Sequence, residues 1–202
     1  MDLLNKKEIE VAKKIISAGL VKSAESLSFF MNETITLKDF ESDQLLNGSP
    51  WESSKKDESN IQLLTTKVIG DLKGVCCLIF SEKEADQLRS AALPLEILAS
   101  PEMMKEMSDD IMLEVDNIIS ESVITQFSNL LNVKIHGSVP DLKKVNYIEM
   151  KEFIANEISN ELYLVSFKTS FESSKVVFNP EFVWLFDAAF TNSIKRYAAE
   201  NV

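Results

Sequence analysis

The chain has 202 residues, 45% of them hydrophobic and 26% charged, which is ordinary for a globular protein with a full core. Its formal net charge of −11 would repel other anions, so we expect neither nucleic acid nor an anionic membrane surface as a partner. No stretch has transmembrane length, and residues 1–7 lack the apolar core of a signal peptide, so we expect a cytoplasmic protein.

The first half of the chain predicts a long helix and a hairpin. Residues 5–31 form an amphipathic helical pattern, and residues 33–37 follow as a short β-like run. Residues 61–69 are rich in β-branched side chains, and residues 75–80 form an apolar run typical of a buried strand. The turn residues 70–74 between them complete the predicted hairpin.

A helix is predicted directly after this hairpin. Ser81 and Glu84 have the spacing of a capping box, which opens a helix that continues through Ala92. Cys76 and Cys77 are neighbours in the preceding strand, so their side chains should point to opposite faces of the sheet. We therefore expect neither a disulfide nor a metal pair from them.

The second half predicts a similar series of elements. Residues 109–131 form a second amphipathic helix, followed by a short β-like run at 133–135. Residues 161–171 predict a strand, and residues 172–178 predict a tight turn with its partner strand. Asn179-Pro180-Glu181 then resembles the start of a helix through Ala189, because proline suits the first helical position.

The two halves match at an offset of 100 residues. Three residues recur unchanged: Ser28 as Ser128, Asn32 as Asn132 and Ile35 as Ile135. The register needs no gap over roughly 25 residues, so we interpret the chain as a degenerate tandem duplication. The predicted fold is α/β (α+β), with two helix-strand-hairpin-helix pseudo-repeats sharing a mainly antiparallel sheet and long helices packed on it. We expect a single domain over residues 1–202, with pseudo-repeats at about 5–95 and about 105–200.

One stripe of the second long helix carries the strongest indication of function. Asp110, Glu114 and Asn117 fall within about a 60° stripe of the helix, and Glu121 continues it. Pro140 follows Asn117 with 22 residues between them. The apolar residues occupy the rest of the circumference: Ile111, Met112, Leu113, Val115, Ile118, Ile119, Val123, Phe127, Leu130 and Leu131. Such a stripe is often only a solvated surface, and that interpretation stays open.

This spacing resembles the active-site signature of the CheC/CheX/FliY family, whose members dephosphorylate the chemotaxis response regulator CheY. The turn Gly70-Asp71-Leu72-Lys73-Gly74 and its flanking strands also resemble a family element. The resemblance implies two catalytic residues, Glu114 and Asn117. Asn117 would orient the attacking water, and Glu114 would contact a lysine in the active site of the response regulator. Asp110 and Pro140 would bind the partner or shape the site.

The resemblance also implies which partners and cofactors to expect. The chain would need no cofactor of its own, because the Mg²⁺ ion and the phosphoryl group belong to the receiver domain of the partner. A phosphorylated CheY-like response regulator is the expected partner, and the deamidase CheD and a second copy of this chain are further candidates. With one histidine, His136, and no Cys/His spacing, the sequence does not predict a zinc site.

The first pseudo-repeat lacks the chemistry of this stripe. Glu10, Lys14 and Ser17 stand where the second copy has Asp110, Glu114 and Asn117, and the residue that corresponds to Pro140 is Phe40. We therefore expect one site, on the second long helix. Two alternatives stay open: a binding adaptor of the same fold that holds CheY-like or CheD-like partners, and a structural dimer whose stripe is plain surface.

Overall fold

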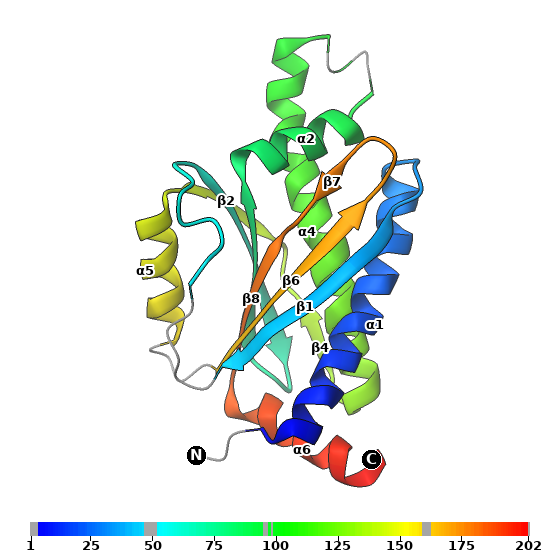
Figure 1. Cartoon of the computed structure of the whole chain (residues 1–202), viewed down its shortest axis with the longest axis vertical. Helices are drawn as coiled ribbons and strands as arrows, with labels where there is room; N and C mark the ends of the chain where they lie inside the picture. Colours follow the sequence, from blue (N-terminus) through cyan, green and yellow to red (C-terminus); the bar gives the residue numbers. More distant parts are fainter. Residues whose placement is uncertain (1–3, 47–51, 95–96, 98, 159–162, 202) are drawn as a thin grey trace.

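The structure, a computed structural model, describes residues 4–46, 52–94, 97, 99–158 and 163–201 (Figure 1). Its elements follow one another along the chain as α1 (Lys6–Phe30), β1 (Thr36–Leu46), β2 (Ile61–Gly70), β3 (Gly74–Ser81), α2 (Glu82–Ala92), α4 (Pro101–Leu131), β4 (Ile135–Gly137), β5 (Asp141–Val145), α5 (Tyr147–Ile158), β6 (Tyr163–Glu172), β7 (Val177–Phe178), β8 (Glu181–Phe186) and α6 (Ala188–Asn201).

Within these residues, eight strands form one sheet in which every neighbouring pair is antiparallel. The strand order is β1-β6-β8-β3-β2-β4, and β5 also pairs with β2 while β7 pairs with β6. The order is the same from either edge: an outer strand, then the two strands of a hairpin, with β8 and β3 meeting in the middle. The predicted fold class is confirmed, whereas the bounds of the repeats and the single-domain assignment stay predictions.

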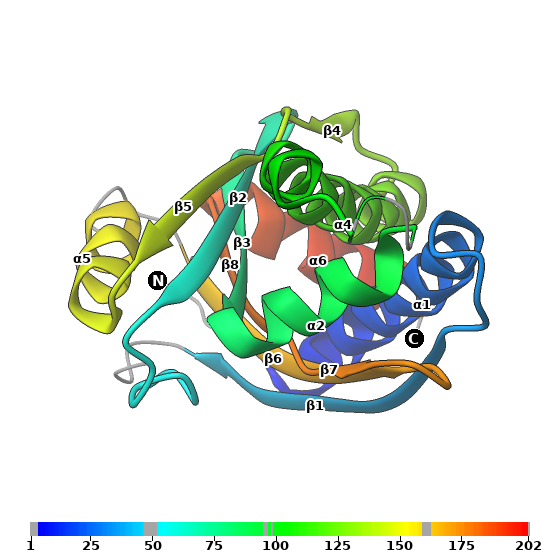
Figure 2. The same cartoon turned by 90° about the horizontal axis from the view of Figure 1, so that it is seen from above.

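The two long helices lie side by side on one face of the sheet, and α5 covers part of the other face (Figure 2). Ser23 of α1 donates a 3.4 Å hydrogen bond to the carbonyl of Ile119 in α4. At Gly19 the helices are so close that a Cβ atom would lie 2.6 Å from the Cα of Val123. An offset of 100 turns the pair Ser23–Ile119 into the pair Val123–Gly19, as expected for antiparallel helices related by an approximate two-fold axis.

The residues that recur at the ends of the long helices have a structural purpose. Asn32 and Asn132 both adopt the left-handed conformation, with φ of 49° and 52°, which asparagine tolerates better than most residues. The Ser28 hydroxyl accepts a hydrogen bond from the backbone N–H of Ile35, at 2.8 Å. The Ser128 hydroxyl donates to the carbonyl of Val133, at 2.7 Å. The identities at offset 100 therefore mark two equivalent helix ends.

The turn between β2 and β3 fixes the hairpin to its surroundings. Gly70 has φ of 127°, and a side chain there would collide with the carbonyl of Lys134. Asp71 accepts a 2.7 Å hydrogen bond from the backbone N–H of Lys134, just before β4. At Gly74 a Cβ atom would lie 2.2 Å from the carbonyl of Leu185 in β8. Both glycines are thus required by close backbone approach.

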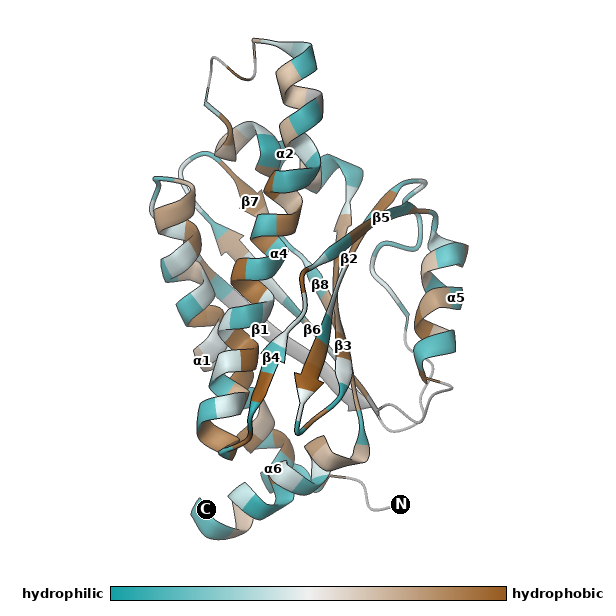
Figure 3. Cartoon of the chain, turned by 180° about the vertical axis from the view of Figure 1, so that it is seen from behind, coloured by the Kyte–Doolittle hydropathy of each residue, from teal (hydrophilic) through white to brown (hydrophobic). Residues whose placement is uncertain are grey.

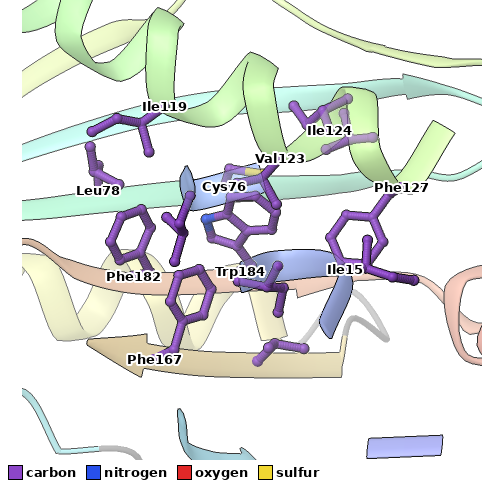
Figure 4. Close-up of a cluster of buried hydrophobic side chains, with 14 of the residues drawn as sticks. Ile15, Cys76, Leu78, Ile119, Val123, Ile124, Phe127, Phe167, Phe182 and Trp184 are labelled. Atoms are coloured by element: carbon purple, nitrogen blue, oxygen red, sulfur yellow. The ribbon is translucent and has the colours of Figure 1, made fainter. Parts of the chain in front are cut away.

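The sheet is buried on both faces. One apolar cluster fills the space between the sheet and the helices α1 and α4; in Figure 4, Trp184 lies among Ile15, Val123, Phe127 and Phe167. A smaller cluster joins the opposite face to Met150 and Ile154 of α5. Cys76 belongs to the first cluster and Cys77 to the second, so their opposite orientation is confirmed, and both thiols are free.

The prediction of a helix starting at Asn179-Pro180-Glu181 is wrong. Residues 181–186 form strand β8 in the middle of the sheet, and α6 begins only at Ala188. All six residues of β8 are buried, and the run of five apolar residues after Glu181 suits a strand covered on both faces as well as a buried helix. The proline instead interrupts the run of β7 and β8 along β6.

Other predicted bounds shift by less. The second long helix begins at Pro101, eight residues before the predicted start, with Ser100 as its N-cap. Strand β1 continues to Leu46 because it pairs with β6 along the edge of the sheet. Strand β5 and helix α5 were not predicted, and residues 161–162 of the predicted strand lie outside the described residues. Of the helices in the described part of the chain, none is long and apolar enough to cross a membrane.

Candidate functional site

The predicted stripe lies on the outer surface of α4. Asp110, Glu114 and Asn117 are all exposed, and they project from the same side of the helix. The opposite side is inaccessible to solvent at Met112, Val115, Ile119 and Val123. Packing on that side fixes which way the helix faces, and therefore presents the three residues together. Their chemical roles stay predictions.

Two residues of α4 depart from the predicted apolar surface. Leu130, expected among the packed residues, is 39% exposed near the end of the helix. Asp116 is the opposite case, because it lies between Glu114 and Asn117 in sequence yet is completely buried. The sequence carries one signal for it: Asp116 is four residues after Met112 and three before Ile119, so it interrupts the apolar side of the helix.

Asp116 ties α4 to the sheet. Its carboxylate accepts a 2.6 Å hydrogen bond from the Thr66 hydroxyl of β2 and a 3.2 Å bond from the Ser120 hydroxyl. Neither partner is cationic, so burial dominates and raises the pKa of Asp116 from 3.8 to about 6, although both hydrogen bonds oppose this shift. The bond to Thr66 adds a directional constraint on the rotation of the helix that bears Glu114 and Asn117.

Pro140 lies beside α4, in a bulge between β4 and β5. Both strands follow β2, with Gly137 opposite Val68 and Asp141 opposite Thr65, so residues 138–140 interrupt one otherwise continuous run. Figure 3 shows this run passing next to α4. The backbone N–H of Gly137 donates a 3.2 Å hydrogen bond to the carboxylate of Glu121, which holds the bulge against the helix.

The exposed stripe is acidic. Asp110 and Glu114 form no ion pair with any described residue. Asp109, one residue earlier, pairs with Lys144 of β5 at 2.9 Å. Among the residues that the structure describes, no group of three or more histidine, cysteine, aspartate or glutamate side chains could hold a metal ion. The stripe presents two carboxylates and an amide to solvent.

A groove adjoins Glu114 on the α1 side. It has a volume of about 650 Å³ and is lined by Glu25, Ser26, Phe29, Phe30, Glu114 and Ile118. The first four residues belong to the C-terminal end of α1, and the last two to α4. Because α1 and α4 are antiparallel, the end of the first repeat's helix lies beside the middle of the second repeat's helix. Periodicity alone did not predict this groove.

The corresponding surface of the first repeat has different chemistry. Lys14 is exposed and Ser17 is half-buried, at the positions that match Glu114 and Asn117. A smaller cavity of about 400 Å³ lies there, lined by Lys7, Glu10, Val11, Lys14, Ile15, Leu130, Tyr197 and Asn201. A lysine thus stands at the position of the glutamate, beside a cavity that shares only Lys14 and Leu130 with the groove at corresponding positions.

Comparisons of the sequence with protein families and with curated proteins found no match. Comparison of the structure did, and FliY of Thermotoga maritima aligns over 100% of both chains with a TM-score of 0.70 and 16% identity. The chain has the fold of the CheC, CheX and FliY proteins. A CheX in complex with CheY, BeF₃ and Mg²⁺ from Borrelia burgdorferi aligns at a TM-score of 0.52 and 16% identity, over 85% of this chain and 97% of that one.

The same fold includes the middle domain of FliM. The middle domain of FliM from H. pylori aligns over 96% of this chain and 99% of its own, with a TM-score of 0.56 and 10% identity. At these identities the likeness concerns the fold. What a protein of this fold does has to be argued from its surface residues.

Proposed function

We propose that this protein is a phosphatase that hydrolyses the aspartyl phosphate of a CheY-like receiver domain. One observation carries the proposal. An exposed carboxylate and an exposed amide, Glu114 and Asn117, lie one helical turn apart on a helix whose orientation is fixed by its buried side. They match the family signature, and the equivalent positions of the first repeat hold Lys14 and Ser17.

Asn117 would act on the attacking water. A carboxamide both donates and accepts hydrogen bonds and does not titrate, so it can hold a water in line with the phosphorus without acting as a strong base. The water oxygen forms a bond to phosphorus while the bond between phosphorus and the aspartyl oxygen breaks. The aspartate leaves as a carboxylate, and the protons of the water pass to the inorganic phosphate and the solvent. Positioning is the main contribution required in such a transfer.

Glu114 would fix the receiver domain in place. It is an exposed anion without an ion-pair partner among the described residues, and it could accept a charge-assisted hydrogen bond from a lysine beside the phosphorylated aspartate. Asp110, one turn earlier, would extend the same acidic contact. The Mg²⁺ ion that neutralises the phosphoryl group would arrive with the receiver domain, and such a partner places the reaction in the cytoplasm.

The decay of a phosphorylated receiver domain tests the proposal. A CheY-type receiver domain from the same organism is labelled with acetyl phosphate and Mg²⁺, the phosphodonor is removed, and the remaining phosphoprotein is followed with and without this protein. Acceleration that grows with the concentration of this protein supports the phosphatase. An unchanged decay, under conditions in which the two proteins demonstrably bind, would contradict it.

A non-catalytic adaptor is the second candidate, favoured by the likeness to a FliM middle domain and by the presence of the Glu–Asn pair in one repeat only. Such a module would hold a CheY-like or CheD-like protein, or pair with a second copy of itself, without changing the partner's chemistry. It would bind the phosphorylated receiver domain yet leave the half-life of the phosphate unaltered.

A further inference from the structure

Two apolar side chains project almost fully into solvent. Phe29 is 92% exposed and Val139 is 89% exposed, whereas the other exposed large hydrophobic residues of the described chain lie between 36% and 67%. Exposure of a single hydrophobic residue is common, but these two are not randomly placed. They come from different repeats, and each lies next to α4.

Phe29 stands on the α1 side of the acidic stripe. It lines the same groove of about 650 Å³ as Glu114 and Ile118, so an apolar surface continues directly from the carboxylate. Phe30, its neighbour, lines the same groove and packs in part against the main apolar core. Phe30 therefore anchors this side of the groove to the core, and the neighbouring Phe29 ring projects into solvent.

Val139 stands on the opposite side of α4, at the tip of the bulge between β4 and β5. Ser138, the residue before Val139, fixes the bulge to β2 through two hydrogen bonds. The backbone N–H of Ser138 donates to the carbonyl of Lys67 at 2.8 Å, and the Ser138 hydroxyl accepts from the backbone N–H of Lys67 at 3.0 Å. The bond from Gly137 to Glu121 adds a contact to the helix. Figure 2 shows α4 between α1, whose C-terminal end bears Phe29, and β4, which the bulge with Val139 follows.

The first repeat supplies an internal comparison. The residue 100 positions after Phe29 is Asn129, which is exposed, and the residue 100 positions before Val139 is Asp39. In the sequence, polar residues therefore stand at the two positions of the first half that match Phe29 and Val139, just as Lys14 and Ser17 match Glu114 and Asn117. The two apolar residues, one from each half, thus accompany the stripe that carries the Glu–Asn pair.

We propose that Phe29 and Val139 are the two apolar contacts that seat a receiver domain across the α4 stripe. The inference rests on the proposed function and adds the surface that gives affinity. The partner would present apolar residues on both sides of its phosphorylation pocket, with a cation between them to meet Glu114. Exposed aromatic and aliphatic groups around a polar centre suit such a contact, because truncating a buried anchor is commonly costly to binding.

Binding to a receiver domain that cannot be hydrolysed tests the inference without relying on catalysis. The probe is the same CheY-type receiver domain loaded with BeF₃⁻ and Mg²⁺, titrated against wild type, Phe29→Ala and Val139→Ala. We expect each substitution to raise the dissociation constant about tenfold, the size of a typical anchor effect. Ile148→Ala is the matched control: Ile148 is 67% exposed on α5, which covers the other face of the sheet, and its removal should leave affinity unchanged.

Turnover kinetics with the phosphorylated domain distinguish an effect on docking from an effect on the chemical step. Phe29→Ala and Val139→Ala should raise KM and leave kcat near the wild-type value, since neither side chain reaches the water that Asn117 holds. If wild type binds the BeF₃⁻ form but does not hydrolyse the phosphate, the proposed function fails, while weaker binding of both variants still supports the docking surface.

Other outcomes overturn the docking surface. Wild-type affinity in both variants, with hydrolysis intact in the wild type, would contradict the docking surface and leave the phosphatase standing. If Phe29→Ala changed the oligomeric state of the protein in solution without changing receiver binding, Phe29 would belong to a contact between copies of this chain. Thermal unfolding midpoints of both variants should match the wild type, because neither side chain is buried.

Discussion

The Thr66 hydroxyl donates a 2.6 Å hydrogen bond to the carboxylate of Asp116, so strand β2 holds the inner side of the helix whose outer side bears Glu114 and Asn117. Asp116 is fully buried and has no cationic partner among the described residues. The protein thus keeps a charge that is costly to bury directly beneath its candidate site. Constraint of the helix, rather than stability, is the benefit that this arrangement offers.

Asp116→Asn should stabilise the protein at neutral pH. Burial raises the pKa of Asp116 from 3.8 to about 6, so the folded state disfavours the ionised form. The loss of folding stability from ionising buried Asp116 is absent below about pH 4, grows as the pH rises, and reaches its full value above about pH 7. A pKa shift of about two units corresponds to about 3 kcal/mol. The free energy of unfolding of the variant should therefore exceed that of the wild type by about 2–3 kcal/mol at pH 8 and by almost nothing at pH 4. Urea unfolding at both pH values measures this.

The exposed Asp110 is the control on the same helix, and Asp110→Asn should leave the free energy of unfolding at pH 8 near the wild-type value. Thr66→Val tests the other half of the bond: it leaves the buried carboxylate with Ser120 alone and should cost about 1–3 kcal/mol at pH 8. If Asp116→Asn were less stable than the wild type at pH 8, the ionised carboxylate would be stabilising the fold, and the pKa argument would be wrong.

Asn117→Ala should remove most of the acceleration of phosphate hydrolysis while binding stays largely intact. Loss of one orienting group in a preorganised site commonly costs on the order of a hundredfold in rate. Stability should hardly change, because Asn117 is exposed and alanine is the better helix former. Asn129→Ala, at another exposed asparagine of α4, is the matched control. Single-turnover decay at saturating enzyme measures the effect, and a wild-type rate in Asn117→Ala would reduce the stripe to plain surface.

Glu114→Lys should weaken docking more than Glu121→Lys. Glu114 is exposed without an ion pair in the described chain, whereas Glu121 is occupied by the backbone of Gly137. Binding of the wild type should also weaken as salt rises, because screening reduces the attraction between the acidic stripe and basic groups of the receiver domain. Titration of the BeF₃⁻-loaded receiver domain at low and high salt measures both. Equal losses for the two variants would mean that overall charge governs binding.

Lys14→Ala and Ser17→Ala should leave turnover unchanged. These residues occupy the positions equivalent to Glu114 and Asn117, but neither offers a carboxylate or an amide to a receiver domain. The measurement is kcat/KM with the phosphorylated receiver domain, beside a melting curve for each variant. A large loss of activity in a folded variant would refute the assignment of one site per chain.

Gly19→Ala should destabilise the protein even though alanine favours helices by about 1 kcal/mol. The added Cβ would lie 2.6 Å from the Cα of Val123 and 2.7 Å from one of its methyl groups, so the two long helices would have to separate. We expect a net loss of about 1–3 kcal/mol in urea unfolding. Adding Val123→Ala should recover only part of it, since the backbone contact persists. A stabilised Gly19→Ala would contradict the close crossing.

The long helices and the first hairpin were predictable because their signals are local and agree with the tertiary structure. Apolar periodicity indicated the long helices, turn glycines indicated the hairpin, and the capping box of Ser81 and Glu84 indicated α2, while the recurrence of Ser28 and Asn32 led us to predict the duplication. Strand β8 was not predictable in this way, because its apolar run lacks alternation and follows an Asn-Pro pair. Its position between β6 and β3 settles the conformation, and a single sequence does not display that pairing.

The candidate site also has a part that the sequence predicted and a part that depends on tertiary structure. Periodicity placed Asp110, Glu114 and Asn117 on one exposed stripe, since helical spacing alone decides that question. It did not reveal Phe29 or the burial of Asp116. Whether a residue of one element meets the surface of another depends on the crossing of α1 and α4 and on the course of β4 and β5, which arise only when the sheet has assembled.

The antiparallel crossing of α1 and α4 has a consequence for the history of this chain. The groove beside Glu114 is lined by the end of α1, whereas the cavity beside Lys14 is lined by Leu130 at the end of α4 and by Tyr197 and Asn201 of α6. An isolated half could complete such a groove only by pairing with a second half. The first half therefore contributes to the candidate site although it lacks the Glu–Asn pair, because Phe29 and Phe30 at the end of its helix line the groove beside Glu114.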